Sequence, residues 1–193
     1  MRNKYEQADE TTLIKGCLRG YGTAQRALYE RFSSTMMGVC YRYTRNRSDA
    51  EDILQEGFIR VFKSLEQYRA DGSLEGWIRK IMVRTAINFL NKNKNLLLNI
   101  GLEQAGEIPA GDNNKEDPNG NEMMKMLNNM PDGYKTIINL FAIEGYSHKE
   151  IGEMLGIAES TSRSQYVRAK EMLIKLNNKQ AGMHTLNKLK DKA

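Results

Sequence analysis

Apolar residues recur at spacings of three and four along almost the whole chain, which is the period of an α-helix that buries one face. Long runs in which polar and apolar residues alternate, the pattern of half-buried strands, do not occur in the sequence. Proline, which interrupts helices, occupies only 3 of the 193 positions. The pattern therefore predicts an all-α fold.

Residues that cap or break helices predict the first two elements. We expect the first helix over 12–19, ended by Gly20, which readily adopts the left-handed conformation at a helix end. The second helix is expected to begin after Thr23, a good N-cap residue, and to end near Arg45. The residues predicted to line its buried face are Ala27, Leu28, Phe32, Met36, Val39, Cys40 and Tyr43.

The next two helices have clearer start signals. Ser48 and Glu51 have the spacing of a capping box, in which each side chain bonds the other residue's backbone, so we expect the third helix to start there. The segment 67–73 breaks the periodicity, and Ser73 is expected to cap a fourth helix that runs to about Leu90. Three long helices would then pack on one core.

Helical periodicity is lost over 91–121, where Asn, Gly and Asp accumulate together with two of the three prolines. We interpret this segment as a flexible linker between two small helical domains. The predicted division is a domain of three to four helices at 1–94, the linker at 95–121, a second domain at 122–178, and a basic tail at 179–193 that frays.

Order returns in the last third of the chain. A helix is expected from Glu122, and Pro131 suits the first position of the next one, because the missing N–H of proline is not needed there. Gly145 is expected to end that helix. Ser147 and Glu150 then form a second capping box in front of a short apolar pattern.

The stretch from 146 to 173 fits a helix-turn-helix, with a turn at Gly156 and a second helix over 159–177. Ser, Thr and Gln side chains can bond base edges or phosphates in the major groove, and Arg can bind guanine or phosphate. An ordinary helical hairpin with a solvated polar face is the alternative. The residues expected to face DNA are Ser160, Thr161, Ser162, Arg163, Gln165 and Arg168, and those expected to pack inward are Tyr166, Val167, Ala169, Leu173 and Leu176.

Composition narrows the class of protein. The net charge of +5 and the isoelectric point near 9.1 favour an anionic partner such as nucleic acid, although many proteins with this charge bind none. The mean hydropathy of -0.63 and the lack of a segment of roughly 20 apolar residues argue against membrane insertion. The N-terminus lacks the apolar core of a signal peptide, so we expect a cytoplasmic protein.

Residues that carry chemistry in other proteins are sparse here. Cys17 and Cys40 fall within helical apolar patterns, so we interpret them as buried, reduced thiols. His148 and His184 have no nucleophile beside them in the sequence, and no glycine-rich phosphate loop or metal-ligand spacing occurs. We therefore expect no catalytic site, no metal and no cofactor, and a protein that is not an enzyme.

Two segments resemble a known family. The run "DAEDILQEGFIRVF" followed by "GSLEGWIRKIMVRTAINFL" looks like the second conserved region of bacterial sigma factors, and "MPDGYKTIINLFAIEGYSHKEIGEMLGIAESTSRSQYVRAKEML" resembles their fourth region. No long third-region domain lies between them, which is similar to the extracytoplasmic-function group of the sigma-70 family. The resemblance implies a specificity subunit of RNA polymerase that recognises promoters, with possible silencing by an anti-sigma protein.

The resemblance implies a polymerase-binding surface on the third helix. In the family this helix docks on the clamp of the largest polymerase subunit. Read without the family, the same acids form a solvated face that is favourable near a helix N-terminus. The implied contacts are Asp49, Glu51, Asp52, Gln55 and Glu56.

The resemblance also assigns the fourth helix and the loop before it to the minus-10 promoter element, where an unpaired base is held outside the stack. Basic side chains on this helix can neutralise phosphates. Tyr68 could stack on a base, although a tyrosine at a helix end is more often packed, and we assign Trp77 to the core. The implied contacts are Tyr68, Arg69, Asp71, Ser73, Arg79, Lys80, Arg84 and Asn88.

Two departures from the family pattern concern the second helix of the helix-turn-helix, which would bind the minus-35 element. Ala158 stands where many relatives have a capping serine, and Ser162 occupies a position that is commonly apolar. Two other functions stay open from the sequence: a stand-alone helix-turn-helix regulator, and a helical adaptor that binds only protein through its acidic helix.

Overall fold

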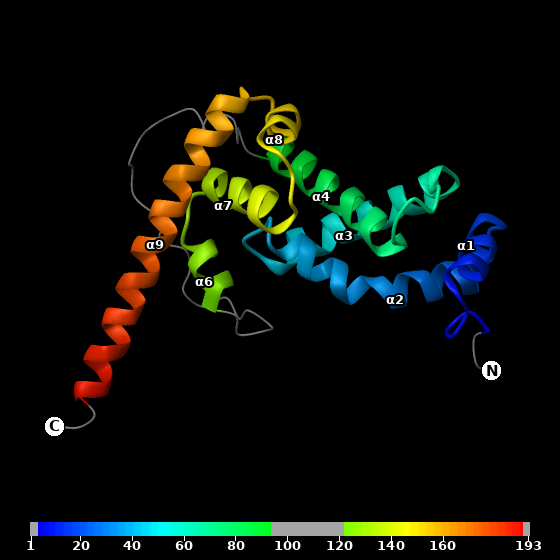
Figure 1. The fold of residues 1–193 in the computed structure, drawn as a ribbon. Helices are drawn as coiled ribbons and strands as arrows, with labels where there is room; N and C mark the ends of the chain where they lie inside the picture. The colour runs from blue at the N-terminus through cyan, green and yellow to red at the C-terminus, as the bar shows by residue number, and fades with distance from the viewer. Residues whose placement is uncertain (1–3, 94–121, 191–193) are drawn as a thin grey trace. The chain divides into compact units, whose positions relative to one another are not determined.

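The computed structural model describes residues 4–93 and 122–190, and the side chains of 93, 122, 123 and 179–190 are outside that description. The chain divides into two compact units, residues 1–92 and 93–193. Every regular element within the described ranges is helical (Figure 1), which confirms the predicted all-α class. The linker predicted at 95–121 lies outside the described residues.

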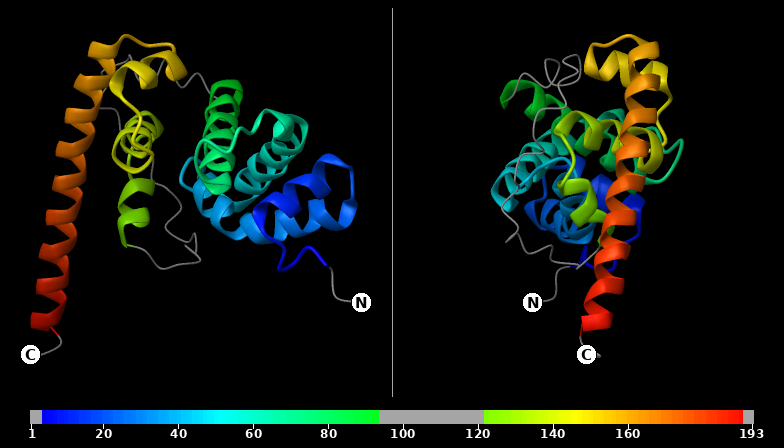
Figure 2. Two further views of the ribbon diagram at one scale, coloured as in Figure 1. Left: turned by 45° about the vertical axis from the view of Figure 1, so that its right-hand side comes forward. Right: turned by 90° about the vertical axis from the view of Figure 1, so that its left-hand side faces the viewer.

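The first unit contains α1 (Glu10–Leu18), α2 (Gly22–Tyr41), α3 (Arg47–Ser64), the short 3-10 helix η1 (Leu65–Gln67) and α4 (Leu74–Asn93). Helix α2 packs against both α1 and α3, and η1 reaches back to α1. The fully buried core draws large side chains from each long helix: Leu13, Leu28, Met36, Ile53, Leu65, Leu74, Ile78 and Met82. Figure 2 shows these helices from two further directions.

The caps of this unit differ in part from the prediction. Helix α3 starts two residues earlier than a Ser48 cap would allow, because Asn46 is its N-cap and accepts a bond of 2.8 Å from the backbone N–H of Asp49. The Asn46 amide also donates to the Asp49 carboxylate at 2.9 Å. Glu51 pairs with Arg47 at 2.8 Å, so the expected Ser48–Glu51 capping box is wrong.

Helix α2 also begins before the expected residue. Tyr21 is its N-cap without a side-chain bond, and Thr23 lies inside the first turn, so the predicted Thr23 cap is wrong. The helix ends at Tyr41, a few residues short of Arg45. The predicted cap at Ser73 is confirmed, since its hydroxyl accepts from the backbone N–H of Gly76 at 3.1 Å.

The two cysteines are buried and form no disulfide, as the sequence predicts. Burial raises the pKa of the Cys17 thiol to about 11 and that of Cys40 to about 12. Because the thiolate is the reactive form, both side chains act as small apolar groups of the core.

The second unit contains α6 (Glu122–Asn128), α7 (Asp132–Ile138), a π-helical segment η2 (Asn139–Ile143), α8 (His148–Leu155) and α9 (Glu159–Lys190). Its core forms where α6 and α7 pack on α9, around Leu127, Met130, Ile138 and Ala169. Pro131 precedes the first helical residue, Asp132, so it stands one position earlier than predicted.

Helix α9 is longer than expected. The sequence predicts an end near Asn177 and a fraying tail, but the helical backbone continues to Lys190, and its C-terminal part extends beyond α6 in both views of Figure 2. Eight of the thirteen residues at 178–190 are Lys, Leu, Met, Gln or Ala, which favour helix, and none is proline. The prediction placed the helix end where the amphipathic pattern stops, and it did not take the intrinsic helix preference of these residues into account.

Candidate nucleic-acid interface

Helices α8 and α9 form the predicted helix-turn-helix. Ser147 accepts from the backbone N–H of Glu150 at 3.3 Å while the Glu150 carboxylate accepts from the Ser147 N–H at 2.8 Å, so this capping box is confirmed. Gly156 ends α8 with φ of 68°, in the left-handed region that the turn requires. Within the turn, the backbone N–H of Ile157 donates to the Gly152 carbonyl at 3.0 Å.

One face of the first turns of α9 is open to solvent. Arg163 is exposed and pairs with Glu159 one turn earlier, and Arg168 is exposed two turns after Ser160. Thr161 is half-buried. Two exposed residues on this face were missed from the sequence, Ser164 and Val167, and the helical spacing from Ser160 was the signal for both.

Three positions on α9 contradict the prediction. Ser162 is 0% and Gln165 is 6% exposed, so neither side chain can reach DNA in this arrangement. Both lie on the side of α9 that packs against α7 and α8. Val167, which was expected to pack inward, is 54% exposed because it falls on the opposite side of the helix from the buried Ala169.

The acidic residues of α3 separate into two groups. Asp52, Gln55 and Glu56 are exposed, whereas Asp49 and Glu51 are half-buried and take part in the local bonds to Asn46 and Arg47. Glu56 accepts from Arg60 at 2.8 Å, a surface pair that can exchange at little cost. The first group is therefore the part of α3 that is accessible to a partner.

Ile59 lies on the same face of α3 as Asp52 and Glu56, because positions seven and three residues apart share a helix face. It is 47% exposed. A single exposed apolar side chain is common on protein surfaces, so Ile59 alone does not mark an interface. The sequence prediction omitted Ile59, although its place outside the apolar stripe of α3 was a usable signal.

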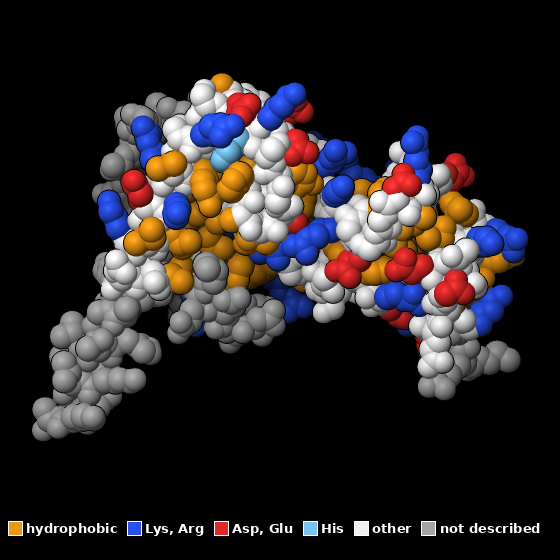
Figure 3. Space-filling view, viewed as in Figure 1, with side chains coloured by type: hydrophobic (Ala, Val, Ile, Leu, Met, Phe, Trp, Pro, Cys, Tyr) orange, Lys and Arg blue, Asp and Glu red, His pale blue; other side chains and the backbone are white. Residues whose placement is uncertain are grey.

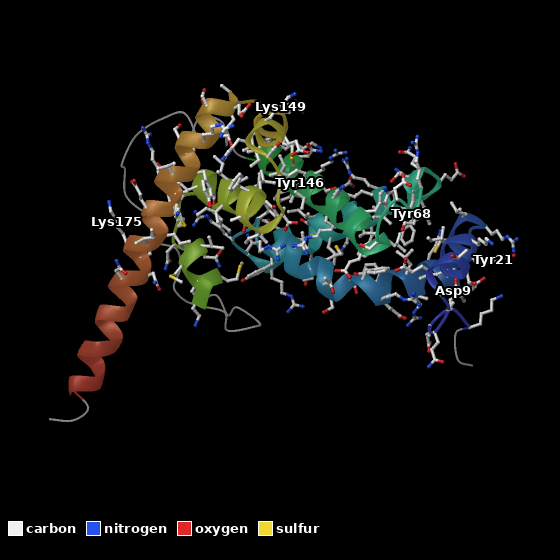
Figure 4. All side chains as sticks on the ribbon, in the orientation of Figure 1. Asp9, Tyr21, Tyr68, Tyr146, Lys149 and Lys175 are labelled. Carbon is white, nitrogen blue, oxygen red and sulfur yellow. The ribbon has the colours of Figure 1, made fainter. Side chains whose placement is uncertain are left out.

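The loop between η1 and α4, together with the start of α4, lines an open hollow of about 440 Å³. Its wall holds two aromatic rings, Tyr68 and Trp77, whose centroids are 5.5 Å apart and whose planes are tilted by 54°. The Tyr68 hydroxyl donates to the Gly72 carbonyl at 2.7 Å, which holds the ring across the loop (Figure 4). The lining residues are Gln67, Tyr68, Arg69, Asp71, Gly72, Ser73, Gly76, Trp77 and Lys80.

The structure corrects the assignment of Trp77 to the core. Leu74, Ile78 and Met82 are fully buried, and Trp77 lies beside them at the edge of α4, half-buried against Tyr68. Part of the Trp77 side chain therefore stays accessible at the boundary of the core. In the same loop Ala70 has φ of 59°, a left-handed conformation that is uncommon for a residue with a side chain.

Basic and polar side chains continue from this hollow along α4. Lys80 lines the hollow, and Arg84 and Asn88 follow at spacings of four, so the three share one exposed face. Arg79 is half-buried next to this row. The loop and α4 therefore bring most of the residues predicted for the minus-10 element to one surface.

Charge is distributed over both units. On the face in Figure 3, Lys and Arg side chains alternate with Asp and Glu instead of forming one basic patch. No three His, Cys, Asp or Glu side chains in the described ranges lie close enough together to hold a metal ion. Across the same residues, no helix is both long and apolar enough to cross a membrane.

Comparison with known proteins gives matches over both units. A family model described as Sigma-70 region 2 matches residues 28–96, and one described as Sigma-70, region 4 matches residues 120–173. An ECF RNA polymerase sigma-E factor of Haemophilus influenzae is 30% identical over 184 residues, covering 87% of this chain and 95% of that protein. The RNA polymerase sigma factor SigV of Bacillus subtilis is 32% identical over 136 residues, covering 70% and 80%.

Among solved structures, the sigma factor RpoE of Bartonella quintana, crystallised with the anti-sigma factor NepR, is similar with a TM-score of 0.49. It shares 16% identity with this chain, and the match covers 79% of this chain and 96% of that one.

Proposed function

The chain belongs to the extracytoplasmic-function group of the sigma-70 family, and we propose that it binds core RNA polymerase and directs it to promoters. The first unit would bind polymerase through α3 and the minus-10 element through α4 and the loop before it. The second unit would bind the minus-35 element through α8 and α9. In this proposal polymerase supplies the chemistry, and the chain supplies specificity and helps open the DNA.

The hollow lined by Tyr68 and Trp77 is the observation that carries this proposal. Its volume of about 440 Å³ lies within the usual range for small-ligand sites, so one unpaired base has room inside it. A base that stacks on an aromatic ring gains roughly 1–3 kcal/mol, which offsets part of the few kcal/mol needed to leave the duplex. A surface that binds the open strand better than the duplex shifts the equilibrium toward melted DNA without a separate source of energy.

The row of Lys80, Arg84 and Asn88 supports the same assignment. It begins at the hollow and continues along α4, so a strand whose base enters the hollow would have its phosphates beside these side chains. Arg69, Asp71 and Ser73 line the loop side of the site, and Arg79 flanks the row.

For the minus-35 element, the proposal uses the exposed face of α9. Ser160, Arg163 and Arg168 are accessible, Thr161 is partly so, and the helix N-terminus favours a phosphate. Arg163 would exchange its pairing with Glu159 for a base or phosphate contact. Ser162 and Gln165 have no place in this contact because they are buried.

The polymerase surface would be centred on Asp52, Gln55 and Glu56, with Asp49 and Glu51 shaping the start of α3. Asp52, Gln55 and Glu56 are accessible on a helix that otherwise packs in the core. An acidic helix face suits a protein partner, because it would repel DNA. Each unit would bind DNA weakly by itself, and joint attachment to one polymerase would raise the effective concentration of both.

The two alternatives left open by the sequence are less well supported. A stand-alone regulator or a protein-only adaptor gives no reason for a region 2 match and a region 4 match in one chain. An anti-sigma partner would cover the polymerase-binding and DNA-binding surfaces. The proposal includes such a regulator as a class and names no particular protein.

Charge reversal tests the polymerase surface. Replacing Asp52→Lys and Glu56→Lys together should abolish association with core polymerase, because the acids that face the partner become repulsive while both side chains stay in solvent. Co-purification with core polymerase measures the loss, and circular dichroism checks the fold.

The matched control is Glu30→Lys with Glu66→Lys, which changes the net charge equally at exposed sites on α2 and η1. The control should bind polymerase normally. Normal binding by the Asp52/Glu56 variant would show that the proposed surface is wrong.

A further inference from the structure

A histidine ties the two helices of the helix-turn-helix together. His148 is the first residue of α8, and its Nδ1 lies 3.0 Å from the hydroxyl oxygen of Ser162 on α9. Ser162 is 0% exposed, so its hydroxyl needs a partner within the protein.

The imidazole is held by aromatic rings from two other elements. Phe141, in the π-helical segment η2, stacks on it with centroids 4.2 Å apart and planes 10° apart. Tyr166 of α9 is tilted against both rings, with its centroid 4.5 Å from Phe141 and 5.8 Å from His148. The ring therefore has one defined orientation, in which Nδ1 points at Ser162.

The position of Ser162 matters because of its neighbour. Arg163 follows directly in sequence, is exposed, and is the main candidate for a major-groove contact. Successive residues of a helix are rotated by about 100°, so fixing Ser162 against α8 fixes the direction in which Arg163 leaves the helix. A contact on the buried side of α9 thus sets the geometry of its exposed side.

The surroundings keep His148 neutral near neutral pH. Its partial burial, and then the positive charge of Arg163, lower the pKa of the imidazole, while Glu159 acts in the opposite direction. The η2 segment contributes no ionisable side chain, Tyr166 of α9 contributes only its ring, and Lys149 and Glu150 follow on α8 itself. The neutral imidazole and the Ser162 hydroxyl can form one hydrogen bond, and the tautomer of the ring decides which group is the donor.

We propose that His148 is a positioning residue for recognition of the upstream element: through Ser162 it holds α9 so that Arg163 enters the groove in one register. This inference rests on the proposed function of α8 and α9. His148 need not touch the bases, and its effect should appear in specificity more than in total affinity.

The test uses the full chain bound to core polymerase and compares binding to a promoter duplex with binding to the same duplex carrying a scrambled upstream element. His148→Phe keeps the stacking ring but removes the bond, and Ser162→Ala removes the other partner. Each variant should lower the ratio of the affinity for the intact duplex to the affinity for the scrambled duplex about three- to tenfold. The double variant should lower this ratio no further, because both changes delete the same interaction.

His148→Asn provides the rescue, since its amide can occupy the place of Nδ1 and bond Ser162; it should restore most of the ratio. Ser33→Ala, a half-buried serine on α2 in the other unit, is the matched control and should change nothing.

Arg163→Ala separates failure of this inference from failure of the proposed function. If Arg163→Ala lowers the ratio but the His148 and Ser162 variants leave it unchanged, His148 does not position α9. Loss of thermal stability in these variants without loss of the ratio would overturn the inference in the same way. If Arg163→Ala also leaves the ratio unchanged, the assignment of α9 to the upstream element is wrong.

Discussion

Tyr68 shows how a single side chain can serve both the fold and a ligand. Its hydroxyl is engaged by the Gly72 carbonyl at 2.7 Å, so the ring is oriented before any DNA arrives. The ring is tilted by 54° against Trp77, and both residues line the hollow. A preoriented ring loses little conformational freedom on binding, which favours stacking on a single base.

Replacing Tyr68→Ala should weaken binding of polymerase holoenzyme to DNA with an unpaired minus-10 strand by about 1–3 kcal/mol, because a stacking surface is lost. Fluorescence anisotropy with a labelled partly single-stranded promoter measures the effect. Tyr68→Phe is the matched control, since it keeps the ring and removes only the hydroxyl, and it should bind within a few-fold of the natural chain. Equal binding by the alanine variant would exclude Tyr68 as a stacking surface.

The helix-turn-helix depends on a close backbone approach within its turn. A side-chain carbon at Gly152 would lie 2.7 Å from the Ile157 carbonyl oxygen, which is closer than packed atoms approach. The oxygen belongs to the backbone of the turn and cannot rotate away. The separation of α8 from α9 is therefore set by a residue without a side chain.

We expect Gly152→Ala to destabilise the second unit by about 1–3 kcal/mol, as overpacking of a tight contact does. Thermal unfolding of the full chain followed by circular dichroism measures the change. Gly38→Ala is the control, because Gly38 is an exposed helical position on α2 with nothing within 4 Å of the added carbon. That variant should be about 0.5–1 kcal/mol more stable, and similar effects of the two changes would contradict the packing argument.

Elements defined by local signals were predictable from the sequence. The Ser147–Glu150 capping box at the start of α8 joins residues one turn apart, and the left-handed Gly156 at its end is a property of one residue. Both predictions were confirmed. The start of α3 was mispredicted because two good caps, Asn46 and Ser48, lie two residues apart, and the additional bond from Asn46 to Asp49 decides between them. Spacing alone does not rank such candidates.

The parts of the site that could not be predicted depend on contacts between distant residues. Ser162 is buried because its hydroxyl meets His148, 14 residues earlier, across the turn. Likewise Arg31 of α2 donates to the Ala8 carbonyl at 2.8 Å and fixes the chain in front of α1. The spacing of apolar residues does not reveal either of these hydrogen bonds. Helical patterning therefore predicted a polar face for α9 but not which of its polar residues are buried.

For the whole molecule, the central feature is that one chain holds two units, each with its own core. The first is closed around residues such as Leu28 and Ile78, and the second around Leu127 and Met130. Each unit presents a different candidate DNA-binding surface. The account therefore requires both surfaces to act on one promoter while the chain is bound to polymerase.

Transcription with purified components tests this requirement most directly. Bacterial core polymerase lacking any sigma factor is mixed with the chain and a randomised promoter library, and the transcripts are sequenced. The account predicts transcripts with defined start sites whose templates share two motifs, an upstream one lost with Arg163→Ala and a minus-10 one weakened with Tyr68→Ala. Absence of chain-dependent transcripts, together with tight sequence-specific DNA binding by the free chain, would contradict it.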